Sequence, residues 1–409
     1  MRSNLIAGLD IGTTRTCVVI GELTGDARRA GLKILGVGQA RSGGLRGELV
    51  TNIEEATESV RTAVKEAELM AGVTVDRLYT GIAGEHIQAR ASMGVVAVSG
   101  QDIQDSDVDR VHEVARAVAL PPDRELVHAI PTEYIVDHQG GIKDPVGMSG
   151  TRLEAEVYLV TCSSTAAENI RRAVGRAGYR VQELVLEPLA SSRAVLTEDE
   201  KEVGAAMVEI GGSTTDLAAF FEGKIRRVAV LPVGGKAVST DLVKGLSIPL
   251  AEANRVKEQY GAAMSRMIDP EENVEIPGPA PGQTRHVARE IIAHIIEQRL
   301  DEILGLVHDE LQQECLIPKL GAGIVITGGT AAMPGLVELA QQVFASPVRL
   351  GVPGEGLTGL ADRVGRPRFT CAAGLALHGA ERYAQTGEGA STLTSGVLTR
   401  MGAWLQEFF

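Results

Sequence analysis

The chain has 409 residues, of which 44% are hydrophobic and 23% charged; this is ordinary for a globular protein of two or more domains and excludes a disordered chain. Its 53 acidic side chains outnumber the 40 basic ones, and the net charge of −13 argues against nucleic acid as a partner. Asp10 interrupts the first apolar run, which therefore does not fit a secretory signal, and no apolar run reaches the roughly 18 residues that a membrane span needs.

The four cysteines, Cys17, Cys162, Cys315 and Cys371, lack the C-x-x-C spacing of metal and redox sites. They fall in apolar runs, where a cysteine usually behaves as a small hydrophobic residue. This pattern favours buried free thiols in a reducing compartment over a metal site or disulfides.

The first predicted element, residues 5–20, is an apolar strand ending near Asp10, a turn with Gly12, Thr13 and Thr14, and a second apolar strand. Glycines in such a turn allow backbone conformations closed to other residues, so that N–H groups and hydroxyls converge on one anion. The pattern therefore predicts a phosphate-binding turn.

A strand at 33–40, a helix at 52–71 and a strand at 77–83 then indicate a mixed α/β domain. Asn52 is the expected N-cap of the helix and Gly72 its stop.

From residue 84 the pattern changes to short strands around one helix. We predict a hairpin, a helix, two strands and a final strand, at residues 86–99, 105–120, 125–130, 132–138 and 153–162. These elements indicate a compact inserted subdomain.

The chain then returns to the first domain with a helix at 164–177 and a strand and turn at 181–188, and a helix at 189–196 leads into a second half. This half opens with residues 208–220, VEIGGSTTDLAAF, which repeat the first hairpin.

Glu209 takes the place of Asp10 in the repeat, and Gly211 to Thr214 form its turn. Two hairpins of this kind predict two related halves that face each other across a nucleotide, with the two carboxylates holding a hydrated Mg²⁺ beside the β- and γ-phosphates. The alternative, in which each carboxylate only caps its turn, stays open.

After the second hairpin, Gly234 and Gly235 introduce a helix at 237–244, and another follows at 250–260. The Pro/Gly-rich residues 276–283 predict an exposed mobile loop, and a long helix is expected from Arg285.

A strand at 323–327 ends at Gly328, Gly329 and Thr330. The glycines permit close approach of the backbone to a flat ring, and the free N–H groups of a helix at 336–344 lie nearby. We therefore expect the nucleoside on this side.

The end of the chain combines a polar segment at 379–395, predicted as a flexible linker, with residues 396–409. Seven apolar side chains of this last segment share one helical face: Val397, Leu398, Met401, Trp404, Leu405, Phe408 and Phe409. The pattern predicts an amphipathic helix that lies on a membrane surface; packing against a domain is the alternative.

The order DIGTT, EPLASS, GGSTTD and TGGT-x4-G resembles the actin/Hsp70/sugar-kinase superfamily. Within it the chain is similar to the bacterial cell-division family FtsA over nearly its whole length. The matching stretches are GVVAVSG, HAIPTEYIVDHQGGIKDPVGMSGTRLEAEVYLVTC, LASSRAVLTEDEKEVG and GIVITGGTAAMPGL.

The resemblance implies an α/β, actin-like two-domain fold with two related mixed-sheet halves around a nucleotide cleft. Its subdomains would be 1A at 1–84 and 163–196, the inserted 1C at 85–162, 2A at 197–227 and 306–378, and 2B at 228–305.

The resemblance also implies a function: an ATP- and Mg²⁺-binding adaptor, peripheral on the cytoplasmic face of the cell membrane at the division site. Such a protein tethers FtsZ through the FtsZ C-terminal tail, polymerises with itself and meets later division proteins.

By position, the nucleotide residues would be Gly12, Thr13, Thr14, Arg15, Gly211, Gly212, Ser213, Thr214, Gly234, Gly235, Lys257, Glu258, Gly328, Gly329 and Thr330. Asp10 and Glu209 would serve the metal, and Arg285 and Arg299 would receive the acidic FtsZ tail.

The second hairpin departs from the superfamily, which usually has Asp at Glu209 and Gly at Ser213. The extra methylene of Glu209 leaves hydrolysis open, although Glu187 falls where relatives orient the attacking water. We expect at most a slow ATPase whose nucleotide acts as a switch. The alternatives are a PilM-like pilus-assembly protein and a metabolic kinase of the same superfamily.

Overall fold

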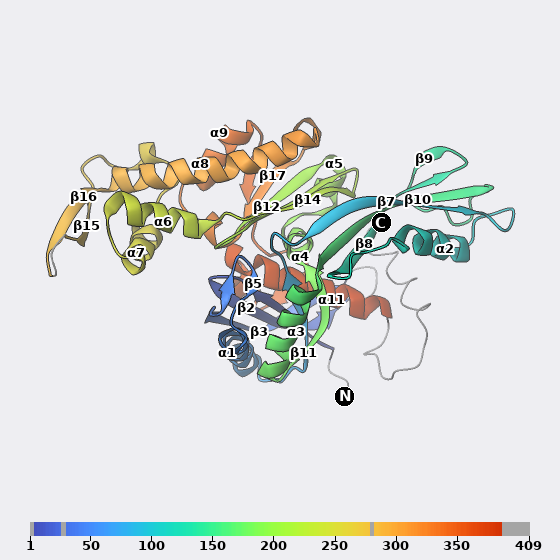
Figure 1. Cartoon of the computed structure of the whole chain (residues 1–409), viewed down its shortest axis with the longest axis horizontal. Helices are drawn as coiled ribbons and strands as arrows, with labels where there is room; N and C mark the ends of the chain where they lie inside the picture. The colour runs from blue at the N-terminus through green and yellow to red at the C-terminus, as the bar shows by residue number, and fades with distance from the viewer. Residues whose placement is uncertain (1–3, 26–29, 279–281, 387–409) are drawn as a thin grey trace.

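The computed structural model describes residues 4–25, 30–278 and 282–386. Two mixed β-sheets lie one above the other at the centre of the molecule, as Figure 1 shows. The first runs in the order β11 (Arg180–Leu186), β6 (Arg77–Ile82), β1 (Leu5–Ile11), β2 (Arg15–Thr24), β3 (Gly31–Arg41) and β19 (Leu357–Gly359). The second runs in the order β14 (Lys224–Leu231), β13 (Thr215–Phe221), β12 (Ala205–Ile210), β17 (Gly323–Thr327) and β18 (Val348–Leu350).

The two sheets repeat one design. In the first, β1, β2 and β3 form an antiparallel meander, and β6 and β11 continue it in parallel from β1. In the second, β12, β13 and β14 form the meander, and β17 and β18 continue it in parallel from β12. The two related mixed-sheet halves are therefore confirmed, and each glycine-rich turn joins the first two strands of its meander.

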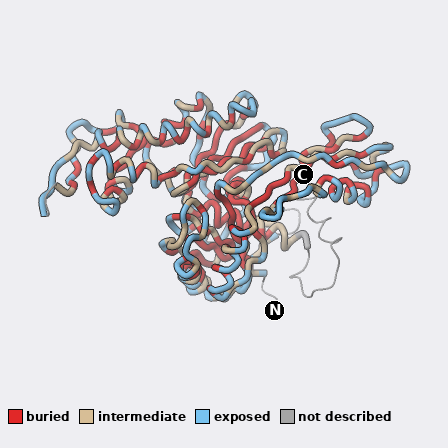
Figure 2. The backbone as a smooth tube through the Cα atoms, in the orientation of Figure 1, coloured by how far each residue is buried: buried red, intermediate tan, exposed pale blue. Residues whose placement is uncertain are grey.

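Helices cover the sheets and fill the space between them, where Figure 2 shows mostly buried backbone. Helices α1 (Ile53–Ala71) and α3 (Ser164–Ala177) pack on the first sheet, and α4 (Glu187–Val195) and α11 (Thr370–Thr386) pack against each other between the halves. Gly374 makes the crossing of α4 and α11 possible, because a Cβ there would lie 1.8 Å from the Ala190 carbonyl oxygen.

Several predicted helices and their ends are confirmed. The side chain of Asn52 accepts hydrogen bonds from the N–H groups of Glu54 and Glu55, and Gly72 ends α1 with a φ of 68°. Helices α3, α7 (Leu250–Tyr260) and α9 (Leu336–Phe344) have the predicted bounds.

The inserted segment is a four-stranded sheet with one helix, at the right of Figure 1. Its strands and helix are β7 (Gln88–Ala97), β10 (Arg152–Ser163), β8 (Arg124–Val136), β9 (Gln139–Ile142) and α2 (Asp105–Arg116).

Three predictions in this insert were wrong. The expected hairpin at 86–99 is the single strand β7, because Gly94 serves close packing rather than a turn: a Cβ there would lie 2.1 Å from the Val111 carbonyl oxygen of α2. The two strands expected at 125–138 are the single strand β8, whose register shifts where Pro131 cannot donate to the ladder. Helix α2 ends at Arg116, before residue 120.

The second half carries an outer layer at the left of Figure 1. It contains α6 (Gly235–Leu246), α7, α8 (Arg289–Gln313) and a hairpin of β15 (Asn273–Pro277) and β16 (Thr284–Ala288). The expected mobile loop at 276–283 is thus partly a hairpin, since Val274 and Ile276 are buried alternately with exposed neighbours, and the long helix begins at Arg289 instead of Arg285.

Two further expectations were wrong. Cys17, Cys162 and Cys371 are buried free thiols, but Cys315 is exposed just after α8. The predicted linker at 379–395 begins too early, because α11 continues to Thr386. Its remainder and the predicted terminal helix lie outside the described residues.

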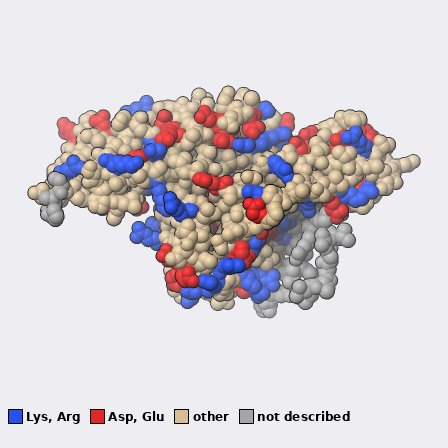
Figure 3. Space-filling model, in the orientation of Figure 1, with Lys and Arg blue, Asp and Glu red and all other residues tan. Residues whose placement is uncertain are grey.

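The remaining elements are short connections. They are β4 (Leu45–Arg46), β5 (Leu49–Val50), α5 (Glu198–Val203), α10 (Ala361–Val364), η1 (Ser265–Met267), η2 (Ile317–Lys319), η3 (Gly329–Ala332) and η4 (Pro367–Phe369). Basic and acidic side chains are interspersed over the face in Figure 3.

Candidate functional site

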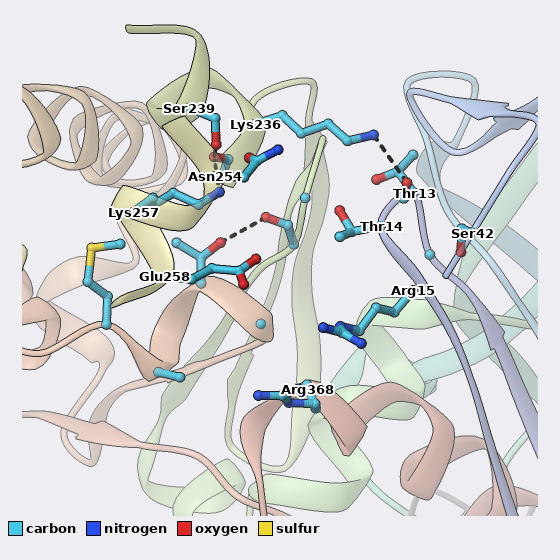
Figure 4. A pocket seen from close by; sticks show the side chains of 18 of the residues that line it. Thr13, Thr14, Arg15, Ser42, Lys236, Ser239, Asn254, Lys257, Glu258 and Arg368 are labelled. Atoms are coloured by element: carbon cyan, nitrogen blue, oxygen red, sulfur yellow. Dashed lines mark hydrogen bonds between the residues drawn. The ribbon is translucent and has the colours of Figure 1, made fainter. Parts of the chain in front are cut away.

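The two glycine-rich turns face each other across a cleft between the halves. A Cβ on Gly212 would lie 2.3 Å from the Thr14 hydroxyl oxygen, so the turns approach closely only because residue 212 has no side chain. From the second half, Lys236 reaches across, and its Nζ donates to the Thr13 carbonyl oxygen at 3.1 Å (Figure 4). The cleft has a volume of about 1110 Å³.

Most of the predicted nucleotide residues line this cleft: Gly12, Thr13, Thr14, Arg15, Gly211, Gly212, Thr214, Gly235, Lys257, Glu258, Gly329 and Thr330. Ser213, Gly234 and Gly328 belong to the same turns but do not line it. Gly234 packs against the second turn, where a Cβ would lie 2.8 Å from the Gly211 carbonyl oxygen, and Gly328 lies beside the backbone of Ile210 with a φ of 91°.

The turns of the second half hold one another in place. The N–H groups of Gly235 and Lys236 donate to the carbonyl oxygens of Gly211 and Gly212, at 2.9 and 2.7 Å. The Thr330 hydroxyl donates to the Gly211 carbonyl oxygen at 3.1 Å. The three motifs, which lie far apart in the sequence, are therefore joined by hydrogen bonds into one wall of the cleft.

The far side of the cleft is polar and suited to a nucleoside. Lys257 and Glu258 of α7 line this side together with Gly329 and Thr330, and the Nζ of Lys257 donates to the Gly235 carbonyl oxygen at 2.9 Å. Figure 4 shows the carboxylate of Glu258 directed into the space between these elements.

Five carboxyl groups gather at the floor of the cleft. Asp10, Glu187 and Glu209 were predicted, and Glu48 and Asp216 join them. Burial and the charges of Glu209 and Glu48 raise the pKa of Asp10 well above its ordinary value. Burial, followed by the charge of Asp10, does the same to the pKa of Glu187.

The pKa values of Glu209 and Asp216 are raised as well. Burial raises the pKa of Glu209 to about 7, although the hydrogen bond donated by Ser191 of α4 opposes this. Burial and the charge of Glu209 raise the pKa of Asp216 well above its ordinary value. The five groups repel one another when ionised, and a divalent cation would relieve that repulsion.

The donor set fits Mg²⁺. Oδ1 of Asp216 is buried without a hydrogen-bond partner, and one ligand atom each from Asp10, Glu187 and Cys371 lie within 4.8 Å of one another. Carboxylate oxygens are the ligands that Mg²⁺ prefers, while burial keeps the pKa of Cys371 well above its ordinary value and its thiol protonated. Asp10, Asp216 and Glu187 would therefore hold the ion, directly or through water.

Among the charged residues that line the cleft, sequence reasoning missed six: Arg41, Glu48, Asp216, Lys236, Arg255 and Arg368. Asp216 ends the GGSTTD motif and Lys236 follows the glycine pair at a helix N-terminus, so both had a readable signal. Glu48 and Arg368 come from a hairpin tip and from η4 before α11, and no local pattern marks them.

We expect the affinity of the chain for Mg²⁺ to rise several-fold from about pH 6 to about pH 8. The pKa of Glu209 is about 7, so below that pH its carboxyl group is protonated, and above it the carboxylate adds a negative charge beside Asp10 and Asp216, which favours a bound cation. Calorimetric titration with MgCl₂ across this range measures the effect. Glu209→Gln should make the rise smaller without removing it, because Asp10, Glu187 and Asp216 also have raised pKa values, and a flat profile in the unaltered chain would contradict a cation site among these carboxyl groups.

This fold and cleft define the actin-like class of nucleotide-binding proteins. Among solved structures, the chain is similar to a PilM–PilN type IV pilus biogenesis complex (TM-score 0.65, 18% identity, 92% of this chain and 98% of that one). It is also similar to MreB5 of Spiroplasma citri bound to ADP (TM-score 0.52, 12% identity, 93% and 96%). At these identities the likeness shows the fold alone.

The chain belongs to the FtsA family of cell-division proteins. A family model described as Cell division protein FtsA matches residues 206–374, and one described as the SHS2 domain inserted in FtsA matches residues 84–161. FtsA of Neisseria meningitidis is 41% identical, over 99% of this chain and 98% of the relative, and FtsA of Pseudomonas aeruginosa 39% over the same shares. FtsA of Escherichia coli is 36% identical, over 98% and 96%.

The comparisons distinguish among the three families that the sequence analysis considered. The curated relatives favour FtsA over the PilM-like protein and over the metabolic kinase. Among the described helices, none is long and apolar enough to cross a membrane.

Proposed function

We propose that this chain binds ATP with Mg²⁺ in the cleft and acts as an adaptor that fastens FtsZ filaments to the cytoplasmic membrane during division. The observation that carries the nucleotide part is the meeting of two phosphate turns at five carboxyl groups, of which Glu48, Glu187 and Asp216 are buried and Asp10 and Glu209 half-buried. The MreB5 structures bound to ADP and to AMPPNP share the fold, which supports a nucleotide in the same cleft. Calorimetric titration of the full chain with Mg-ATP tests it.

The nucleotide acts in this proposal as a conformational switch. ATP would bridge the turns of both halves, and closure would favour contacts between subunits of a filament. Many weak membrane helices in one filament then give firm attachment. Filament formation followed by light scattering should therefore depend on Mg-ATP.

Hydrolysis, if the chain performs it, would use Glu187 to orient water. Glu187 lies at the start of α4, on the cleft floor, packed over Gly81. Its pKa is well above the ordinary value, so the carboxyl group is a poor base until a cation relieves the surrounding charge. This supports a slow ATPase at most.

The FtsZ site is proposed on the outer layer of the second half. Arg285 is exposed on β16 and donates to the Leu246 carbonyl oxygen, and Arg299 of α8 pairs with Asp241 and Glu302. An acidic tail would have to compete with these two carboxylates for Arg299, so Arg285 is the more available cation.

An Arg285→Glu, Arg299→Glu double variant should bind an FtsZ C-terminal tail peptide about tenfold more weakly, because two attractions become repulsions. Fluorescence anisotropy of a labelled peptide measures this. Arg285→Glu alone should account for most of the loss, and Arg172→Glu, an exposed arginine on α3, serves as the control. Unchanged binding by the double variant would remove this site from the proposal.

A further inference from the structure

Glu48 joins the two halves of the molecule directly. Its Oε1 accepts hydrogen bonds from the hydroxyl of Thr13 in the first half, at 3.2 Å, and from the hydroxyl of Thr214 in the second half, at 3.3 Å. Glu48 itself belongs to the first half and is only 8% exposed. One buried carboxylate thus accepts hydrogen bonds from both phosphate turns at once.

The backbone at Glu48 has a positive φ, a conformation that glutamate rarely adopts. Gly47 and Glu48 form the tip of the β4–β5 hairpin with φ values of 57° and 64°, and both central residues of such a two-residue turn need a positive φ. Glycine adopts this conformation freely, while glutamate rarely does. The strain at Glu48 is therefore compensated by what its side chain contacts.

The same hydroxyls are the donors expected to meet the phosphates. A threonine hydroxyl carries one donor proton, which it gives either to Glu48 or to a phosphate oxygen. A carboxylate in this position would also repel the negative phosphates, and the amine of Lys236 is the nearby cation that both would attract.

We propose that Glu48 imitates a phosphate: it bridges Thr13 and Thr214 in place of the terminal phosphate of the nucleotide, and the nucleotide must displace it to bind. This inference rests on the proposed ATP site and adds a residue that lowers nucleotide affinity. In this proposal Glu48 links the two halves in the absence of nucleotide, and the bound nucleotide replaces it as the link.

The test compares Glu48→Gly with the unaltered full chain by calorimetry. Glycine relieves the positive φ and removes the competing carboxylate, so Mg-ATP should bind about tenfold more tightly. ADP, which lacks the terminal phosphate, should gain less. Glu222→Gly is the matched control, because Glu222 has a φ of 57° in an exposed turn outside the cleft.

Glu48→Gln provides a second variant that keeps the shape of the side chain and one acceptor oxygen but loses the charge. We expect a smaller gain in Mg-ATP affinity. In the absence of nucleotide, hydrogen–deuterium exchange in peptides containing Thr13 and Thr214 should be faster in Glu48→Gly than in the unaltered chain.

Three results would overturn the inference. Equal affinity in the unaltered chain and Glu48→Gly would show no competition, and weaker binding by Glu48→Gly would make Glu48 a part of the cation site. If neither protein binds Mg-ATP, the proposed nucleotide function fails and this inference falls with it, which separates that failure from the first two.

Discussion

Asp10→Ala should weaken Mg-ATP binding by about tenfold or more, measured by calorimetry on the full chain. Asp10 lies on β1 immediately before the first phosphate turn, and its carboxylate is one of the oxygens proposed to hold the metal beside the phosphates. Losing it removes an attraction to the cation that water screens only partly, because Asp10 is half-buried.

The control is Asp301→Ala, which removes an exposed carboxylate from α8 without touching the cleft. The sign of the effect is informative, because the neighbouring Glu48→Gly is expected to change affinity in the opposite direction. Unchanged Mg-ATP affinity in Asp10→Ala would count against the metal site.

Deletion of residues 396–409 should release the protein from liposomes. Seven apolar side chains of this segment are spaced for one helical face, and burying five or six of them at roughly 1.5 to 2 kcal/mol each is enough for reversible attachment. Arg400 is balanced by Glu407, so attachment should change little between neutral and anionic lipids.

Co-sedimentation with liposomes measures this effect. A full-length Trp404→Glu, Phe408→Glu variant should also stay in the supernatant, since charge on the apolar face opposes insertion. Arg400→Gln, on the polar side, is the matched control and should still pellet. Equal pelleting of the intact and shortened chains would end the membrane proposal.

The repeated fold was predictable because its signals are local. Each half starts with an apolar strand, a glycine turn and a second strand, and a residue such as Asn52 marks its helix start by the chemistry of its own side chain. The recurrence of the motif then indicated two facing halves.

Long-range packing was harder to predict. Gly94 looks like a turn residue in sequence, but it lies mid-strand because α2 packs on it, and Pro131 looks like a strand break but is accommodated by a shift in register. The structural role of such residues depends on an element that is distant in the chain, and the local sequence pattern does not reveal that contact.

Some residues of the candidate site could likewise be predicted from a local motif, and others could not. Asp10 and Glu209 follow from the motif, but the involvement of Glu48 depends on a strained hairpin tip that meets Thr214, 166 positions away in the chain. Glu209 itself is held by Ser191 of α4, a contact that only the three-dimensional arrangement reveals.

Recruitment of FtsZ to liposomes tests the adaptor proposal most directly. Purified FtsZ, the full chain, Mg-ATP and liposomes are mixed and floated on a density gradient. We predict that FtsZ floats with the lipid only when the full chain is present, and that it stays at the bottom with the chain lacking residues 396–409. Flotation of FtsZ to the same extent with the shortened chain, or none with the intact chain, would contradict the proposal.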